Sequence, residues 1–151
     1  MNEIERICDQ LRRAFDGKAW HGPSVLELLA DVGADRAAAR PIAGAHTIWE
    51  LVHHMAAWED AVRRCIEGEE MRSLADEEDW LPVPDMSEVA WRESVDRLER
   101  AHRLLLESLS GFDAGQLEET VPGASYSFYV MLHGVVQHDL YHAGQIAILR
   151  K

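Results

Sequence analysis

The sequence has few cysteines, no long apolar run and few basic residues, and each scarcity excludes something. Only two of the 151 residues are cysteines, Cys8 and Cys65, and they are far apart in the chain. Two isolated cysteines fit a reducing compartment better than a disulfide framework. No run of about 18 apolar residues occurs, so no segment is predicted to span a membrane. The first residues carry charges from the third position on, which is untypical of a secretory signal. We therefore expect a cytoplasmic protein.

Basic side chains are outnumbered by acidic ones. The chain has 15 Lys and Arg against 27 Asp and Glu, which gives a formal net charge of −12. Such a surface repels nucleic-acid phosphates and anionic lipids, and no dense Lys/Arg cluster offsets it. We therefore expect neither nucleic acid nor a membrane as a partner. The acidic runs at residues 67–70 and 76–79 are predicted to be solvated loops.

What the chain does contain is ordinary for a globular protein. Hydrophobic residues make up 47% and charged residues 28% of the sequence. A chain of this length can bury its own core without disulfides, so residues 1–151 are predicted to form a single domain.

Apolar residues recur at spacings of three and four, which predicts helices throughout. Four helix starts show an oxygen-bearing side chain followed three residues later by Glu, a capping-box pattern. These pairs are Asn2 and Glu5, Ser24 and Glu27, Thr47 and Glu50, and Asp85 and Glu88. Helices are predicted over residues 3–15, 25–29, 47–67, 86–109 and 127–151. The expected fold is all-α, a four-helix bundle in which residues 25–29 form an extra short helix.

Two histidines share the apolar face of the last predicted helix. His138 and His142 are one turn apart and have the same helical phase as Met131, Val135 and Ile146. Burying an unpaired polar group costs roughly 1–3 kcal/mol. A metal ion would satisfy both imidazoles, because the i, i+4 spacing points them toward one place. The alternative is a pair of core or pocket histidines that are hydrogen-bonded to the backbone or to acidic side chains.

A third ligand is expected on the helix over residues 47–67. His54 lies on the flank of the apolar stripe of that helix, whereas His53 lies nearly opposite it and is predicted to be solvated. Three neutral imidazoles suit Zn²⁺, Ni²⁺ or Fe²⁺ and leave coordination positions open. Cys65 is about 16 Å away along the helix, too far to share the ion.

The other histidines and tryptophans are assigned to the surface or to packing. His133 lies opposite the apolar face of its helix, and His46 and His102 are expected at helix ends or on the surface. The pair Trp20 and His21 could supply a pocket residue or a fourth ligand, with packing within its loop as the alternative. Packing is also expected of three further tryptophans, Trp49, Trp80 and Trp91.

Three stretches together resemble a known family. They are WHGPS at residues 20–24, TIWELVHH at 47–54 and QHDLYHAGQI at 137–146. In order and separation they resemble the DinB-like proteins, which include bacterial thiol-dependent transferases. The resemblance implies a four-helix bundle, usually a homodimer, with a site for one zinc, nickel or iron ion. Carried onto this chain, the ligands are His54, His138 and His142, with His53 as the alternative to His54.

The resemblance does not imply a single activity. Some members of the family transfer groups to bacillithiol, mycothiol or glutathione, and many have no known reaction. We therefore hypothesise a metal-dependent S-transferase or hydrolase that acts on a small molecule. The alternatives are a metal-binding stress protein without catalysis and a dimeric structural bundle.

Four further residues lie within about one helical turn of a predicted ligand and could shape a pocket. They are Trp58, Glu59, Tyr141 and Gln145. Ordinary packing is the alternative for each of them. Glu59 has the phase of a core residue and could orient a nucleophile or form an internal ion pair with an arginine.

Overall fold

The computed structural model describes residues 1–151 and contains seven α-helices, one 3₁₀ turn and no β-strand. The elements are α1 Glu3–Phe15, α2 Val25–Leu29, α3 Ala34–Ala38, α4 Ile48–Ile66, α5 Asp76–Asp79, α6 Glu88–Ser110, η1 Ala114–Gln116 and α7 Phe128–Leu149. The predicted all-α class and the five predicted helices are confirmed. No helix has both the length and the apolar character needed to cross a bilayer.

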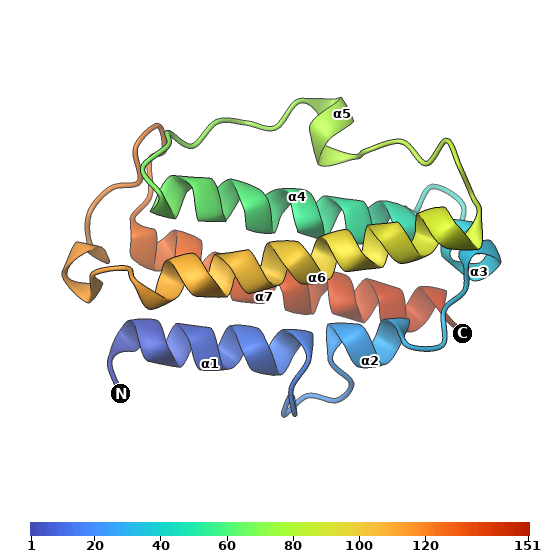
Figure 1. The fold of residues 1–151 in the computed structure, drawn as a ribbon, viewed down its shortest axis with the longest axis horizontal. Helices are drawn as coiled ribbons and strands as arrows, with labels where there is room; N and C mark the ends of the chain where they lie inside the picture. The colour runs from blue at the N-terminus through green and yellow to red at the C-terminus, as the bar shows by residue number, and fades with distance from the viewer.

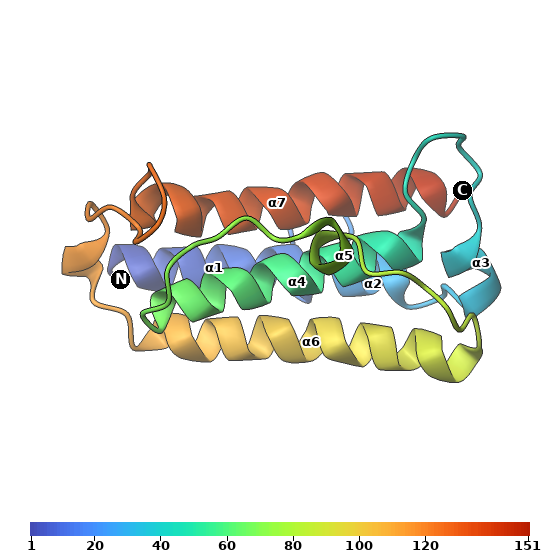
Figure 2. The same ribbon diagram turned by 90° about the horizontal axis from the view of Figure 1, so that it is seen from above.

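The helices form a bundle of four columns (Figure 1). Helices α1 and α2 lie end to end in one column, and α4, α6 and α7 supply the other three. The view from above shows the same arrangement, with α6 and α7 on opposite sides of the molecule (Figure 2). Because α4 and α6 run in the same direction, the segment between them crosses back along the bundle and carries α5 over the outside of α4.

The predicted capping signals form at the N-termini of α1 and α4. The Asn2 side chain accepts a hydrogen bond from the Glu5 amide at 2.9 Å, and the Glu5 carboxylate accepts one from the Asn2 amide at 2.7 Å. Thr47 and Glu50 make the same reciprocal pair at 3.1 and 2.8 Å. These bonds satisfy amides that have no partner within the helix.

The capping pair predicted at residues 85 and 88 was wrong. Ser87 caps α6, because its hydroxyl accepts from the Ala90 amide at 3.2 Å. Glu88 instead accepts a hydrogen bond from the Ala34 amide at 2.7 Å and so caps α3, which the sequence had not predicted. Unlike α2, helix α3 has no capping pair of its own in the sequence, because its cap comes from a residue 54 positions away.

A layer of polar side chains divides the apolar core into two clusters. One cluster joins α2 and α3 to the first half of α4 and the last turns of α7. The other joins α1 to the last turns of α4 and α6 and the first half of α7. Between them lie six polar residues from the middle of the long helices, here called the polar layer: His54, Glu59, His102, His138, Asp139 and His142. The two groups of side chains that could hold a metal ion both lie in this layer.

Candidate metal centre

Three histidines from two helices converge on one point in the polar layer. His138 Nε2 lies 3.0 Å from His54 Nε2 and 3.1 Å from His142 Nε2. Helix α4 supplies His54, and α7 supplies the other two from consecutive turns. For a metal–nitrogen distance of about 2.1 Å, neighbouring ligand atoms are about 3.0 Å apart in an octahedral site and about 3.4 Å apart in a tetrahedral one. The three imidazoles therefore have the spacing of ligands around a single ion.

The outer nitrogens of two of these rings face hydrogen-bond acceptors. His54 Nδ1 lies 2.9 Å from the Asp79 carboxylate and 3.1 Å from the Asp79 carbonyl oxygen. His142 Nδ1 lies 2.6 Å from Gln145 Oε1. An acceptor at Nδ1 places the ring hydrogen there and leaves a lone pair on Nε2, which is the arrangement of metal-binding histidines. Asp79 and Gln145 thus prepare both Nε2 atoms for a cation.

The three histidines do not have enough ring hydrogens to give each of the facing Nε2 atoms a hydrogen bond. With lone pairs on His54 Nε2 and His142 Nε2, only His138 could supply a hydrogen, and that one hydrogen would serve two acceptors. Burial, together with the neighbouring His142 and His54, lowers the pKa of His138 to about 3. Burial also lowers the pKa of His142. The two α7 imidazoles are therefore neutral at neutral pH and available to a cation, so the residues present fit a divalent metal.

Asp79 was not among the predicted site residues, yet it contacts the histidine cluster through His54. Its run was predicted to be a solvated loop, but the segment forms α5, which lies over α4. The Asp79 carboxylate also accepts a hydrogen bond from Trp58 Nε1 at 2.7 Å. The next residue, Trp80, stacks on the His54 ring with centroids 4.0 Å apart. The crossover segment therefore holds His54 in place, a relation that local sequence patterns do not reveal.

Replacing Asp79 with alanine is expected to weaken binding of Zn²⁺ by about 10–100-fold, because His54 loses the acceptor that orients its ring. Competition with a chromophoric chelator would measure the affinity. The matched control is Glu77→Ala, which removes an exposed carboxylate from the same short helix. Equal affinities in the two variants would contradict a role of Asp79 beyond its charge.

An apolar cavity of about 220 Å³ lies beside His138, one of the three histidines. Its wall includes His138 and Trp58, whereas His54 and His142 do not line it. The remaining lining is mostly aliphatic or aromatic, with Val62, Met71, Tyr126, Val130, Met131, Gly134 and Val135. A cavity of this size and polarity suits a small apolar group rather than a charged one.

The prediction that His53 is solvated was wrong. Its ring is buried, and its Nε2 accepts from Trp49 Nε1 at 3.2 Å and lies 2.8 Å from Ser94 Oγ. Its Nδ1 faces the Leu81 carbonyl oxygen at 3.3 Å. The prediction from helical phase assumed that α4 buries only one of its faces. In the structure, α6 and the crossover segment cover a second face of α4. His53 belongs to this separate network and lies outside the three-histidine cluster.

Glu59 and His102 also differ from their expected roles. His102 was assigned to a helix end or the surface but is 4% exposed, because α1 and α4 pack against this part of α6. Glu59 is fully buried and pairs with His102 Nδ1 at 2.9 Å, not with an arginine. Burial raises the pKa of Glu59 to about 8 and that of Asp139 well above its ordinary value. Ionised carboxylates at these two positions thus require a nearby positive charge.

The remaining candidates divide into packing and surface residues. Tyr141 is 67% exposed, and the edge-on contact between its ring and that of His142 has centroids 5.1 Å apart. Trp49 and Trp91 are buried and meet edge to face, which confirms their predicted packing. Trp20 is fully exposed, so the expected packing within its loop was wrong. His21 is also exposed and supplies no atom to the three-histidine cluster.

The fold and the site together define the class of this protein as a helical bundle with a buried histidine cluster that could bind a divalent metal. The model of the DinB superfamily matches residues 19–146, and the chain belongs to that family. Neither the curated proteins nor the solved structures gave a significant match.

Proposed function

We propose that this protein is a metal-dependent enzyme that acts on a small molecule with an apolar portion, as a thiol S-transferase or a hydrolase. One zinc, nickel or iron ion would be held by His54, His138 and His142. The observation that carries the proposal is the approach of three Nε2 atoms to one another beside an apolar cavity that includes His138 in its wall. Three ligands from the protein leave positions for other molecules, which distinguishes catalytic from closed structural sites.

The residues around the cluster have separate tasks in this proposal. A divalent cation bound here would act as a Lewis acid and lower the pKa of a small thiol or water toward neutrality. Asp79 and Gln145 keep hydrogens on the outer nitrogens of His54 and His142. Trp58 lines the apolar cavity together with His138 and is fixed by its bond to Asp79. The apolar lining excludes water and would hold the electrophilic substrate.

Turnover by the metal-loaded protein tests the proposal. The wild type and His138→Ala/His142→Ala would each be incubated with glutathione and an aryl halide, and separately with an aryl ester. We expect conversion by the wild type in one of the two assays, and only the uncatalysed rate with the variant. Product formation would be followed by absorbance. Equal rates for the two proteins in both assays would contradict a catalytic role of these histidines in thiol transfer and ester hydrolysis.

The second candidate is a metal-binding stress protein without catalysis. It is favoured by the position of the histidines, because an ion there would link α4 to α7 across the polar layer. In that case azide would not displace any ligand of a bound Co²⁺ ion, and the visible spectrum of the ion would stay unchanged.

A homodimer would suit the exposed apolar side chains on α7, which include Val130, Tyr141 and Ile148.

A further inference from the structure

A second group of potential ligands lies in the polar layer, apart from the three histidines. Glu59 from α4, His102 from α6 and Asp139 from α7 each offer one ligand atom, and these atoms lie within 4.8 Å of one another. Both carboxyl groups are fully buried, and His102 is 4% exposed. Three different helices therefore bring two acidic groups and one imidazole together in the interior of the bundle. These three residues are called the carboxylate triad below.

The carboxylate triad has buried polar atoms that nothing in the protein satisfies. Both oxygens of Asp139, Oε2 of Glu59 and Nε2 of His102 lack hydrogen-bond partners. Within the triad, His102 Nδ1 lies 2.9 Å from Glu59 Oε1, and Asp139 faces Glu59 closely enough that a shared proton would join the two carboxyl groups. Neither carboxylate has an ion pair with lysine or arginine. Each buried unsatisfied polar group costs roughly 1–3 kcal/mol, and an unpaired charge costs more, so this arrangement requires an additional partner.

We propose that the carboxylate triad binds a second divalent cation. Two ionised carboxylates and a neutral imidazole balance a charge of +2, so the filled site is neutral, as a buried site in a low dielectric should be. The 2.9 Å between His102 Nδ1 and Glu59 Oε1 matches the spacing of about 3.0 Å between neighbouring ligands of a six-coordinate ion. Two oxygen donors and one nitrogen donor suit Mn²⁺, Fe²⁺ or Zn²⁺ better than Ca²⁺ or Mg²⁺, which prefer oxygen alone.

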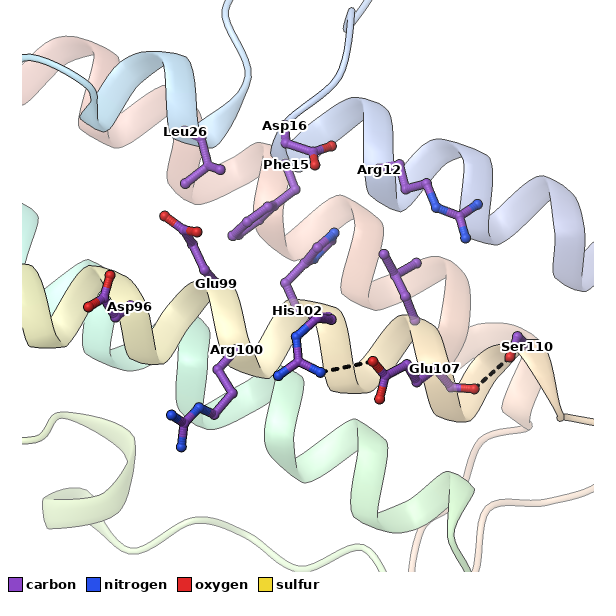
Figure 3. A pocket seen from close by; sticks show the side chains of 12 residues that line it. Arg12, Phe15, Asp16, Leu26, Asp96, Glu99, Arg100, His102, Glu107 and Ser110 are labelled. Atoms are coloured by element: carbon purple, nitrogen blue, oxygen red, sulfur yellow. Dashed lines mark hydrogen bonds and ion pairs between the residues drawn. The ribbon is translucent and has the colours of Figure 1, made fainter.

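A groove on the surface reaches His102 at the edge of this site. It lies between α6 and the end of α1, has a volume of about 650 Å³ and includes His102 in its wall. Figure 3 shows the Phe15 and His102 rings face to face in this groove, and their centroids are 3.8 Å apart. Four carboxylates line the groove together with three arginines: Asp16, Asp96, Glu99, Glu107, Arg12, Arg100 and Arg103.

The second site is independent of the three histidines. Glu59 follows His54 by five residues, which is about 7.5 Å along the helix axis. Asp139 is adjacent to His138, and successive side chains on a helix point about 100° apart. Two metal ions that share bridging ligands lie about 3.5–4 Å apart. The ligands of the two sites are too far apart along the helices, and point in too different directions, to hold two ions that close together. Removal of the histidine cluster should therefore leave the carboxylate triad intact.

Metal stoichiometry in His138→Ala/His142→Ala tests the proposal without altering the triad. The untagged protein would be refolded in the presence of Mn²⁺, Fe²⁺ or Zn²⁺ so that a buried site can fill, then desalted and analysed for metal. We expect about two equivalents in the wild type and about one in the variant for at least one of these ions. No retained metal in the variant with any of them would overturn the proposal and leave protons as the partner of both carboxyl groups.

A matched variant assigns the retained ion to the triad. Glu59→Gln/Asp139→Asn, introduced into the same background, keeps the side-chain shapes and removes both charges. We expect it to lose the remaining equivalent and the rise in melting temperature that the ion gives. Metal retained by this fourfold variant would contradict the assignment. If the fourfold variant does not fold, the metal content of the double histidine variant still tests the second site, because the triad is unchanged in that variant. A wild type with one equivalent that survives loss of the histidines would support the second site and contradict the first.

Discussion

Replacing His54 with alanine is expected to lower the affinity for Zn²⁺ at the histidine cluster by more than about 100-fold, because even the loss of an outer partner of a ligand costs 10–100-fold. The two remaining imidazoles, His138 and His142, come from one helix and cannot enclose an ion without α4. Titration with a competing chelator would measure the change. The thiol or hydrolase chemistry proposed for this site should disappear in parallel.

The neighbouring residue provides the control. His53→Ala also removes a buried imidazole from α4, but that imidazole contacts Trp49, Ser94 and Leu81 instead of the cluster. We expect unchanged metal affinity and a loss of about 1–3 kcal/mol in the free energy of unfolding, because the partners of His53 lose their hydrogen bonds. The reverse result, with metal lost in the His53 variant and retained in the His54 variant, would show that the ligand had been placed one residue too late.

Truncation of Leu132 to alanine is expected to destabilise the protein by about 3–5 kcal/mol. Its side chain is fully buried in the apolar cluster that joins α1 to the first half of α7. The change removes apolar contacts and leaves a cavity that the surrounding helices cannot fill. For a chain of this size we expect the melting temperature to fall by about 8–15 °C in a thermal scan.

Leu140→Ala is the matched control, since it makes the same change on the same helix at a side chain that is 36% exposed. We expect a loss below about 1 kcal/mol, as is usual at exposed positions. A loss as large as that of the Leu132 variant would contradict the exposure of this face in solution and indicate that another chain covers it.

The two apolar clusters explain how the polar layer keeps its geometry. Helices α4 and α7 contribute residues to both clusters, so they are fixed above and below the histidines. A site whose ligands are carried by two such helices needs little reorganisation to receive an ion, which favours tight binding. Of the side chains described above as contacting the three histidines, only Asp79 and Trp80 come from the less regular crossover segment.

The sequence alone predicted five of the eight helical elements and the three histidines that meet in the structure. Periodicity and capping patterns depend on residues three or four positions apart, so all five predicted helices could be placed. The i, i+4 pair of His138 and His142 is local in the same sense. The three short elements α3, α5 and η1 carry no such pattern and were missed.

Only the tertiary structure decided which distant side chains meet. Asp79 reaches His54 because the crossover segment returns along α4, and His102 meets Glu59 because α4 and α6 pack along their length. Helical phase could not predict the burial of His53, because it gives the direction of a side chain relative to its own helix and not what covers that side. Local spacing is fixed by the geometry of a single helix, whereas these contacts depend on how helices and loops far apart in the sequence are assembled.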